Sequence, residues 1–475
     1  MIGQVTKTDV LRTRYVRLPA WIKTGLSPIL GLLPVTTRYG AAYARLQREL
    51  KRTNADGNLA RMLQVDALRK TIDVAQKQSR FYRELMPRTF GGPIDSRSFD
   101  LSDLIRLPIT SRENVAEGPE NFLVVDPRNA DLRQTSGSSG RPPLRIYLDR
   151  DRSVREMAFL HHIWARIGYR LGDGRAILRD YGNNLPTVSR KWRYDRPLKE
   201  LWLSPFDLRE DTMDEYLALL HRYRVRWLYG VPSAISILAS HALRRAWEPP
   251  ACFKGVLPAS ETLFENQRGR IAEAFGGRPI LPFYGLSERV AIAGEVIDRP
   301  QVYAFEPLYG VTELVDKAGI PVSRIGQRGE VVATGFISGA MPLIRYRTGD
   351  CAELVAPPSA ENGYKLHVGG ISSRWSQEFV LGRNGERISV VSLDQHNYAD
   401  LIRDYQYYQN TLGKVVLKVL PCKGVGADSL EAMLRPIRQR VAAVLEITVQ
   451  IVDQLPSGPT GKRAFVDQQL EVSPL

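Results

Sequence analysis

The 475-residue sequence contains few cysteines and histidines, and this shortage excludes several kinds of protein. Its three cysteines, Cys252, Cys351 and Cys422, lie far apart and show no paired spacing. Neither a disulfide framework nor a zinc ribbon fits this pattern, so we expect a reducing compartment. The six histidines form no cluster with metal-ligand spacing, and the sequence therefore predicts no zinc site.

Long apolar runs are also missing. No run reaches the roughly 20 residues that a transmembrane helix needs, and the N-terminus lacks the pattern of a signal peptide. We therefore expect a cytoplasmic protein. Residues 26–35 form a short apolar stretch among arginines and lysines. This stretch leaves open a peripheral contact with anionic lipid at the inner membrane surface, beside the simpler interpretation of an arm packed on the body.

Positive charge is present in excess. The formal net charge is +15 and the pI is near 9.7, so the protein should attract polyanions such as nucleotides, nucleic acid, acidic polysaccharide or anionic lipid. Hydrophobic residues make up 43% of the chain and charged residues 25%, as in a globular protein. The chain is too long for one ordinary hydrophobic core, so we expect more than one domain.

Helix-like and strand-like segments alternate between residues 152 and 295, which is typical of a parallel sheet covered by helices on both faces. Residues 304–354 contain short strand-like runs, and a separate unit begins after residue 374. The predicted fold class is α/β, with a large N-terminal domain (parallel α/β sheets plus a β-rich subdomain) and a small α+β C-terminal domain. We expect a basic N-terminal arm at residues 1–58, the large domain at 59–375 and a small mobile domain at 376–475.

A loop of small and hydroxylated residues precedes a predicted strand at 144–148. Glycines let backbone N–H groups approach an anion closely, hydroxyls add donors, and an arginine adds charge, so polyphosphate is the ligand that suits the loop. The order of residues is not that of a Walker A loop, and a solvated linker is the alternative. The candidate phosphate-binding residues are Thr135, Ser136, Gly137, Ser138, Ser139, Gly140 and Arg141.

Three further loops are predicted at the carboxyl ends of strands, where ligands gather in such sheets: 229–233, 258–261 and 282–288. The last combines an aromatic ring, a glycine, a hydroxyl and a carboxylate, which suits an adenine ring and a magnesium-bound phosphate. The candidate residues in the last two loops are Ala259, Ser260, Glu261, Tyr284, Gly285, Ser287 and Glu288.

Residues 345–350 place two arginines around a tyrosine and then a predicted Thr-Gly turn before Asp350. A carboxylate at this position can accept hydrogen bonds from a diol such as ribose, and Arg345 and Arg347 can hold phosphate. A hairpin closed by an ion pair is the alternative, and the sequence leaves open whether the arginines face phosphate or support the structure. Near the C-terminus, Lys462 follows a Gly-rich stretch and is either solvated or a mobile cationic finger.

Taken in this order, the motifs resemble the AMP-forming adenylating superfamily, and within it the branch of phenylacetate-CoA ligases and CapK-like proteins. The resemblance spans about residues 59–463, and 59–375 would be the adenylating domain. Three further motifs complete the set: Gly329-Glu330 with Thr334, then Ser373-Arg374, and finally Gly461-Lys462. Motifs in family order are far more specific than any one of them alone.

The resemblance implies ATP and Mg²⁺ as cofactors and coenzyme A as the co-substrate. By that resemblance Asp350 and Arg374 bind ribose, Tyr284 stacks on adenine, Glu288 holds Mg²⁺, and Lys462 acts in catalysis with Arg374. The reaction would join a carboxylic acid, aryl or short aliphatic, to AMP and then transfer the acyl group to the thiol. Pocket walls are expected from Tyr181, Tyr229, Val231, Pro232 and Phe283.

Two alternatives stay beside this interpretation. In the first, an adenylating enzyme of capsule, polysaccharide or cofactor biosynthesis passes the group to an amine, a sugar or a hydroxyl. Two residues near the expected hinge, Ser373 and Ser376, depart from the family pattern, so the sequence does not decide the acceptor. In the second, a non-catalytic protein binds polyanions on a degenerate adenylating fold. We expect no nucleic-acid partner, and the sequence decides neither the oligomeric state nor the acid.

Overall fold

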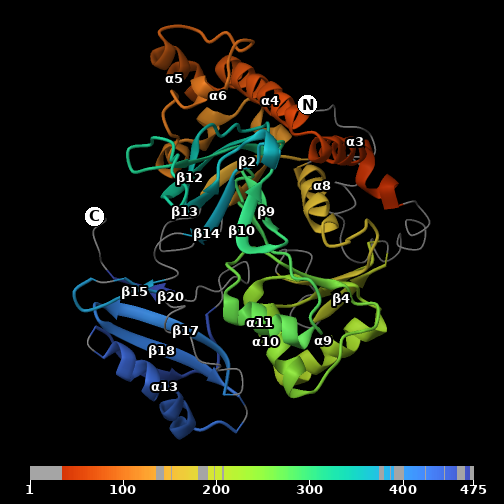
Figure 1. Ribbon diagram of the computed structural model, residues 1–475, viewed down its shortest axis with the longest axis vertical. Helices are drawn as coiled ribbons and strands as arrows, with labels where there is room; N and C mark the ends of the chain where they lie inside the picture. The colour runs from red at the N-terminus through yellow and green to blue at the C-terminus, as the bar shows by residue number, and fades with distance from the viewer. Residues whose placement is uncertain are drawn as a thin grey trace.

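The computed structural model describes the chain from residue 35 to 470 with several gaps (Figure 1). The described residues are 35–134, 144–150, 152–179, 191–196, 198–205, 208–373, 379–385, 387–389, 401–422, 424–442, 444–456 and 466–470.

A five-stranded sheet forms the centre of the part drawn in yellow and light green in Figure 1. Its strands lie in the order β4 (Trp192–Asp195), β5 (Glu200–Leu203), β3 (Arg175–Leu178), β6 (Trp227–Gly230) and β7 (Gly255–Pro258). All neighbours pair in parallel except β4, which is antiparallel to β5. The four parallel strands are buried along their whole length, as expected of a sheet covered on both faces.

Alternate side chains of these strands enter two different hydrophobic cores. Ala176 and Leu178 of β3 pack with α9 (Glu210–Arg222), α10 (Pro232–Arg244) and α11 (Glu265–Ala274). Ile177, between them, packs with α8 (Arg152–Ala165) through residues such as Trp164. The predicted parallel sheet with helices on both faces is therefore confirmed.

A seven-stranded antiparallel sheet forms the second layer of the large domain. Its order is β11 (Gly310–Val315), β12 (Arg328–Gly335), β13 (Tyr346–Ala356), β14 (His367–Ser373), β10 (Arg299–Phe305), β9 (Ile292–Val296) and β8 (Phe283–Gly285). The predicted β-rich subdomain is confirmed and is larger than expected, because it takes in strands on both sides of residues 304–354. An isolated parallel bridge from Ala259 to Phe283 links it to the five-stranded sheet, and side chains of both sheets share one hydrophobic core.

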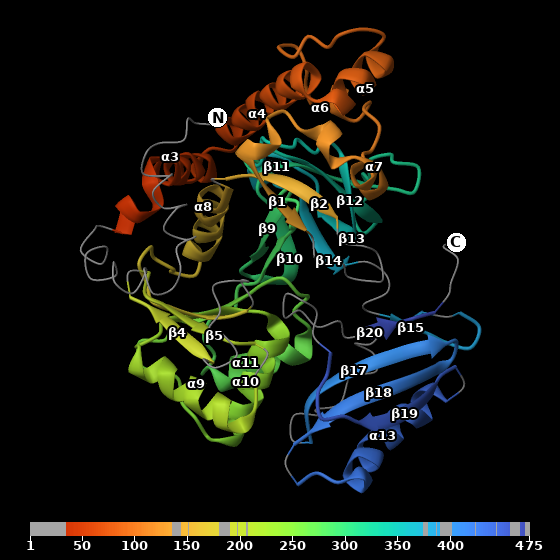
Figure 2. The ribbon, with the colours of Figure 1, turned by 180° about the vertical axis from the view of Figure 1, so that it is seen from behind.

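Helices near the N-terminus cover the antiparallel sheet, as Figure 2 shows from behind. They are α4 (Gly57–Gln78), α5 (Arg80–Phe90), α6 (Leu101–Leu104) and α7 (Arg112–Glu117). The helix α3 (Val35–Ala55) precedes them, and the 3-10 turns Pro119–Phe122 and Pro127–Asn129 and the hairpin of β1 (Ala130–Gln134) and β2 (Arg145–Asp149) follow them. Helix α3 packs on α8 through Tyr39 and Tyr43. The Ser79 side chain accepts a hydrogen bond from the Tyr82 N–H, so it ends α4 and caps α5.

The C-terminal elements form a smaller α+β unit, drawn in blue in Figure 1. Its four-stranded sheet has the order β19 (Glu446–Ile451), β18 (Lys414–Pro421), β17 (Ile402–Thr411) and β20 (Val466–Gln468), covered by α13 (Ala427–Val441). A short hairpin joins β15 (Phe379–Leu381) to β16 (Arg387–Ser389). The α+β class is confirmed, while the expected domain boundaries stay predictions. None of the described helices is long and apolar enough to cross a membrane.

Candidate functional site

The structure brings together two short segments that lie far apart in the sequence, one with Tyr284 and Glu288 and the other with Tyr346 and Asp350. Two hydrogen bonds join the segments, Tyr284 with Asp350 and Tyr346 with Glu288. Other predicted site residues lie outside the described part of the chain, namely Thr135, Ser136, Gly137, Ser138, Ser139, Gly140, Arg141, Arg374 and Lys462, as does Tyr181 of the expected pocket. Their roles stay predictions.

Tyr284 and Asp350 meet although their strands are not neighbours. The Tyr284 hydroxyl donates to Asp350 Oδ2 at 2.6 Å. In the sheet order, β9, β10 and β14 separate β8 from β13. In a flat sheet the two strands would lie about 19 Å apart, at about 4.8 Å per step, which is beyond the reach of one tyrosine. The sheet therefore curls, as twisted sheets do, and joins the two motifs.

The protonation of Tyr284 is fixed by its surroundings. Burial raises the pKa of the Tyr284 hydroxyl well above its usual value, and the nearby carboxylate of Asp350 raises it further. The ring also meets Phe305 of β10 edge to face, with centroids 5.6 Å apart. Tyr284 is therefore a protonated, oriented donor that holds Asp350 in place.

Glu288 is held in a similar way by Tyr346. Glu288 is 8% exposed and Tyr346 is 1% exposed. The Tyr346 hydroxyl donates to Glu288 Oε1 at 3.1 Å, and no described residue bonds to Oε2. A buried carboxylate with one oxygen fixed and the other available is suited to bind a hard cation such as Mg²⁺.

A β-bulge, rather than the predicted Thr-Gly turn, directs Asp350 toward the site. The turn prediction was wrong because β13 continues through this segment, while its pairing with β12 shifts register. Thr348 Oγ1 donates to the Val331 carbonyl at 2.8 Å and accepts from the Asp350 N–H at 3.0 Å. Gly349 has φ 79°, a conformation that glycine adopts without steric cost. The bulge thus changes the direction in which the carboxylate points.

Arg345 is a structural support. It is 3% exposed, and its guanidinium donates to the Glu313 carboxylate at 3.1 and 2.9 Å. It also donates to the carbonyls of Ile105 and Leu107 at 2.7 and 2.6 Å. Burial raises the pKa of Glu313 more than Arg345 lowers it. The sequence left open whether Arg345 faces phosphate or supports the structure. Its donors are directed into the fold, so it supports the structure.

Arg347 also has a partner within the protein. It forms an ion pair with Glu330 of β12 at 3.1 Å, and the two side chains are 41% and 23% exposed. Its backbone N–H donates to the Thr110 carbonyl at 2.9 Å. Arg347 therefore sits at a partly exposed surface next to the site, in contrast to the buried Arg345.

The other predicted loops lie at the edge of the five-stranded sheet, with one exception. Ala259 and Ser260 follow β7, and Glu261 Oε2 accepts from the Ser233 N–H at 3.0 Å, which ties this loop to the start of α10. The 282–288 loop was also predicted at the end of a parallel strand. Ile280 and Phe283 do form parallel bridges with Val256 and Ala259 beside β7, but β8 itself belongs to the antiparallel sheet and provides Tyr284 and the exposed Gly285. Ser287 is exposed as well.

Two expected pocket walls belong to the core instead. Tyr229 and Val231 are each 2% exposed and pack with the helices that cover the five-stranded sheet. Pro232 is buried at the start of α10, and Phe283 is partly buried. The apolar set that suggested an aryl or short aliphatic acid therefore describes the core at least as much as a pocket.

Sequence reasoning missed the support behind the site. Asp149, at the end of β2, accepts from the N–H groups of Gly339 and Ala340 at 2.8 and 2.7 Å. Arg155 of α8 pairs with Asp149 at 3.2 Å and donates to the Ile337 carbonyl at 3.0 Å. These bonds fix the loop that leads to residues 341–350. Tyr346 could have been identified from the alternation of buried residues along β13, since Tyr346 lies on the same face of the strand as Asp350.

Relatives of known name match most of the chain. The CapK C-terminal domain family model matches residues 380–469. Protein CapK of Staphylococcus aureus is 21% identical over 462 residues, which cover 95% of this chain and 98% of that protein. Phenylacetate-coenzyme A ligase of Thermus thermophilus is 23% identical over 433 residues, which cover 85% of this chain and 95% of that ligase.

A solved structure shares the fold. The crystal structure of 2-hydroxyisobutyryl-CoA ligase in the postadenylation state superposes with a TM-score of 0.64. The sequences are 19% identical, and the match covers 85% of this chain and 88% of that one. This likeness supports the predicted α/β architecture of the large domain together with the smaller C-terminal unit.

The buried pair of Arg345 and Glu313 should contribute far more to stability than the partly exposed pair of Arg347 and Glu330. Glu313→Gln leaves a buried guanidinium without its counter-charge, so it should lower the free energy of unfolding by about 3–5 kcal/mol. Glu330→Gln, the matched control on the next strand, should cost about 1 kcal/mol or less. Urea unfolding of both variants measures the difference. Equal losses would show that Arg345 does not depend on Glu313.

Proposed function

We propose that this chain is an AMP-forming adenylating enzyme of the branch of CapK and phenylacetate-coenzyme A ligases, and that it activates a carboxylic acid with ATP and passes the acyl group to coenzyme A. In the first step a carboxylate oxygen bonds to the α-phosphorus of ATP and pyrophosphate leaves. In the second step a thiol attacks the acyl carbonyl and AMP leaves. A cytoplasmic location is part of the proposal.

The proposal depends most on one observation, the hydrogen bond of 2.6 Å from the Tyr284 hydroxyl to the Asp350 carboxylate. The two residues belong to motifs that, by resemblance, bind the adenine and the ribose of one nucleotide. They come from strands that are not neighbours, so their meeting is a consequence of the tertiary fold. A protonated tyrosine that orients a carboxylate leaves that group suited to accept hydrogen bonds from ribose hydroxyls.

Charge on the reacting phosphate has to be neutralised while the acid is held in line. Glu288 would hold the Mg²⁺ that accompanies ATP, through the oxygen that Tyr346 leaves available. The ion would supply positive charge at the phosphate oxygens. Lys462 is proposed to approach the carboxylate and the α-phosphate, and Arg374 to assist at the ribose. Residues 135–141 are proposed to hold the polyphosphate.

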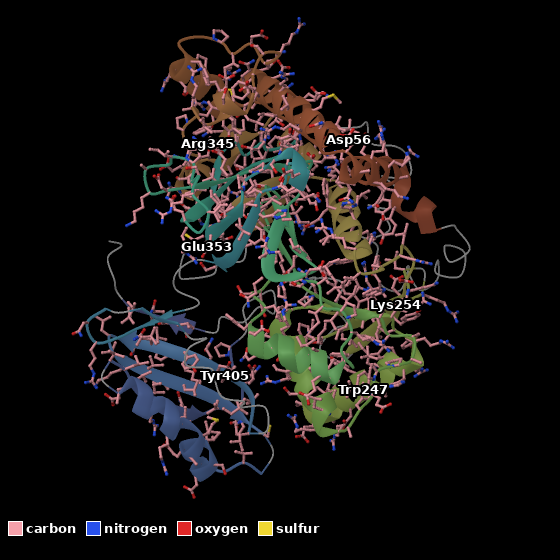
Figure 3. The ribbon with its side chains drawn as sticks, in the orientation of Figure 1. Asp56, Trp247, Lys254, Arg345, Glu353 and Tyr405 are labelled. Atoms are coloured by element: carbon pink, nitrogen blue, oxygen red, sulfur yellow. The ribbon has the colours of Figure 1, made fainter. Side chains whose placement is uncertain are left out.

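Asp350→Asn should raise the KM for ATP by about 10- to 100-fold, because it removes charge-assisted hydrogen bonds to the ribose. Asparagine keeps the shape of the side chain and an oxygen that accepts from Tyr284. Acid-dependent pyrophosphate release at varied ATP measures the effect. Glu353→Gln is the matched control, since Glu353 is exposed three positions further along β13 (Figure 3). An unchanged KM in Asp350→Asn would contradict the ribose assignment.

A second candidate keeps the adenylation and sends the group to an acceptor other than a thiol, such as an amine or a sugar. The observation behind it is that CapK, which matches along nearly the whole chain, is not named as a coenzyme A ligase. A non-catalytic role in binding polyanions has less support, because the paired Tyr284 and Asp350 are the arrangement expected of a nucleotide site.

Coenzyme A separates the two acceptor classes. With ATP, Mg²⁺ and an activated acid, pyrophosphate release should stop after about one turnover without coenzyme A, because the acyl-adenylate stays bound, and it should resume when coenzyme A is added. Desulfo-coenzyme A, which lacks the thiol, is the matched control and should not restore turnover. Turnover that is equal without coenzyme A, or that depends on an amine or sugar, would replace the ligase proposal with the second candidate.

A further inference from the structure

The turn that carries Glu288 ends in a strained residue. Arg289, directly after Glu288, has φ 60°, in the left-handed region that glycine adopts most easily. Its N–H donates to the Leu286 carbonyl at 3.1 Å, which closes the turn around Ser287 and Glu288. A strained backbone conformation of this kind persists only where the surrounding structure holds it. The contacts of Arg289 must therefore keep the turn in its shape.

The side chain of Arg289 forms an ion pair with Glu156 of α8. The two side chains are 28% and 13% exposed, so solvent screens the pair only in part. Burial raises the pKa of the Tyr309 hydroxyl to about 12, and the charge of Arg289 acts on it in the opposite direction. Glycine would adopt this backbone without strain but could not make the ion pair. The pair therefore accounts for an arginine at this position.

The backbone directly after the turn is packed against the end of β12. A Cβ atom built on Gly335 would lie 2.9 Å from both the Arg289 carbonyl oxygen and the Val290 Cα, which is closer than packed atoms normally approach. Val290 and Ala291 are each 1% exposed and belong to a hydrophobic core. The chain is thus fixed from Val290 onward, and Arg289 connects this fixed part to Glu288.

Helix α8 contacts both of the segments that form the candidate site. Arg155 donates to the Ile337 carbonyl at 3.0 Å, in the loop that leads toward Asp350. Glu156, the next residue of the helix, holds the other segment through Arg289. Figures 1 and 2 both show α8 beside β9, the strand that follows the turn. Adjacent residues of one rigid helix therefore align the two segments.

The second segment of the site repeats the same combination. Arg345 has φ 47° and forms its ion pair with Glu313 at 2.9 Å. It directly precedes Tyr346, which donates to Glu288. Each segment thus contains a left-handed arginine tied to a glutamate. Strained residues of this kind are concentrated at functional sites, where they fix the direction of neighbouring side chains.

From these contacts we propose that Glu156 and Arg289 are positioning residues for the carboxylate of Glu288. This role rests on the proposed function, in which Glu288 holds the Mg²⁺ that accompanies ATP. Tyr346 fixes one oxygen of Glu288, and the strained turn fixes the backbone from which the side chain starts. Without the ion pair the turn relaxes toward a conformation that arginine favours, and the second oxygen loses its direction.

The test measures binding of ATP and AMP to the full chain by calorimetry, with Mg²⁺ and with EDTA. The ratio of the two ATP dissociation constants, EDTA over Mg²⁺, gives the contribution of the metal ion. Residues that orient a metal ligand contribute about 10- to 100-fold to metal affinity. Glu156→Gln should therefore reduce this ratio by about tenfold. It should leave AMP binding in EDTA unchanged, because that binding depends on Tyr284 and Asp350.

Arg289→Gly in the Glu156→Gln background separates strain from charge. Glycine adopts φ 60° without strain and needs no ion pair to hold it. The double variant should therefore regain much of the Mg²⁺ ratio that Glu156→Gln loses. If Arg289 instead contacts the phosphates of ATP directly, the double variant will bind ATP more weakly than the single variant, and this result would overturn the proposal.

Asp173→Asn serves as the control for the loss of an ion pair elsewhere. Asp173 pairs with Arg226 at 2.6 Å at the amino edge of the five-stranded sheet, and the side chains are 6% and 43% exposed. This variant should unfold at a lower temperature and keep the full Mg²⁺ ratio.

Two results for Glu156→Gln would contradict the positioning role. A lower unfolding temperature with an unchanged Mg²⁺ ratio would make the pair purely structural, and equal weakening of ATP and AMP binding would mean that the whole site is disturbed. Failure of the proposed function looks different. In that case the wild-type chain would bind ATP no more tightly with Mg²⁺ than with EDTA, and the positioning role would fall with it.

Discussion

The buried ion pair between Arg345 and Glu313 is the constraint on which the candidate site depends. A guanidinium that is almost completely buried requires a counter-charge and acceptors for its remaining donors, and Glu313, Ile105 and Leu107 supply both. The pair therefore fixes where the chain enters β13. From that point the register of the strand places Tyr346 against Glu288, and the bulge after it directs Asp350 toward Tyr284.

Much of the fold could be predicted from the sequence because burial leaves a local signal. The strands of the parallel sheet are short apolar runs, since both of their faces are covered, and the helices between them repeat their apolar residues at helical spacing. The position of Asp350 at the start of a strand-like run, residues 351–355, was also visible. The strand β17 was missed, because Ile402–Thr411 alternates tyrosine and glutamine with few aliphatic residues.

The geometry of the site could not be predicted, because it depends on contacts between residues distant in the sequence. The partner of Arg345 is Glu313 on another strand, and nothing in the sequence near Arg345 identifies it. Thr348-Gly349 favours a bulge as well as a turn, and only the pairing of β13 with β12 distinguishes them. Tyr284 reaches Asp350 only because the seven-stranded sheet curls, which is a property of the whole sheet.

The proposed reaction joins the carboxylate of an acid to the α-phosphorus of ATP. An acid whose carboxylate oxygens carry a heavy isotope tests this most directly, in a reaction that runs to completion with ATP, Mg²⁺ and coenzyme A. The bond that forms runs from the carboxylate oxygen to phosphorus, and the later attack on the carbonyl leaves that oxygen on AMP. We expect one labelled oxygen in each AMP and none in pyrophosphate. Unlabelled AMP, or label in phosphate, would contradict it.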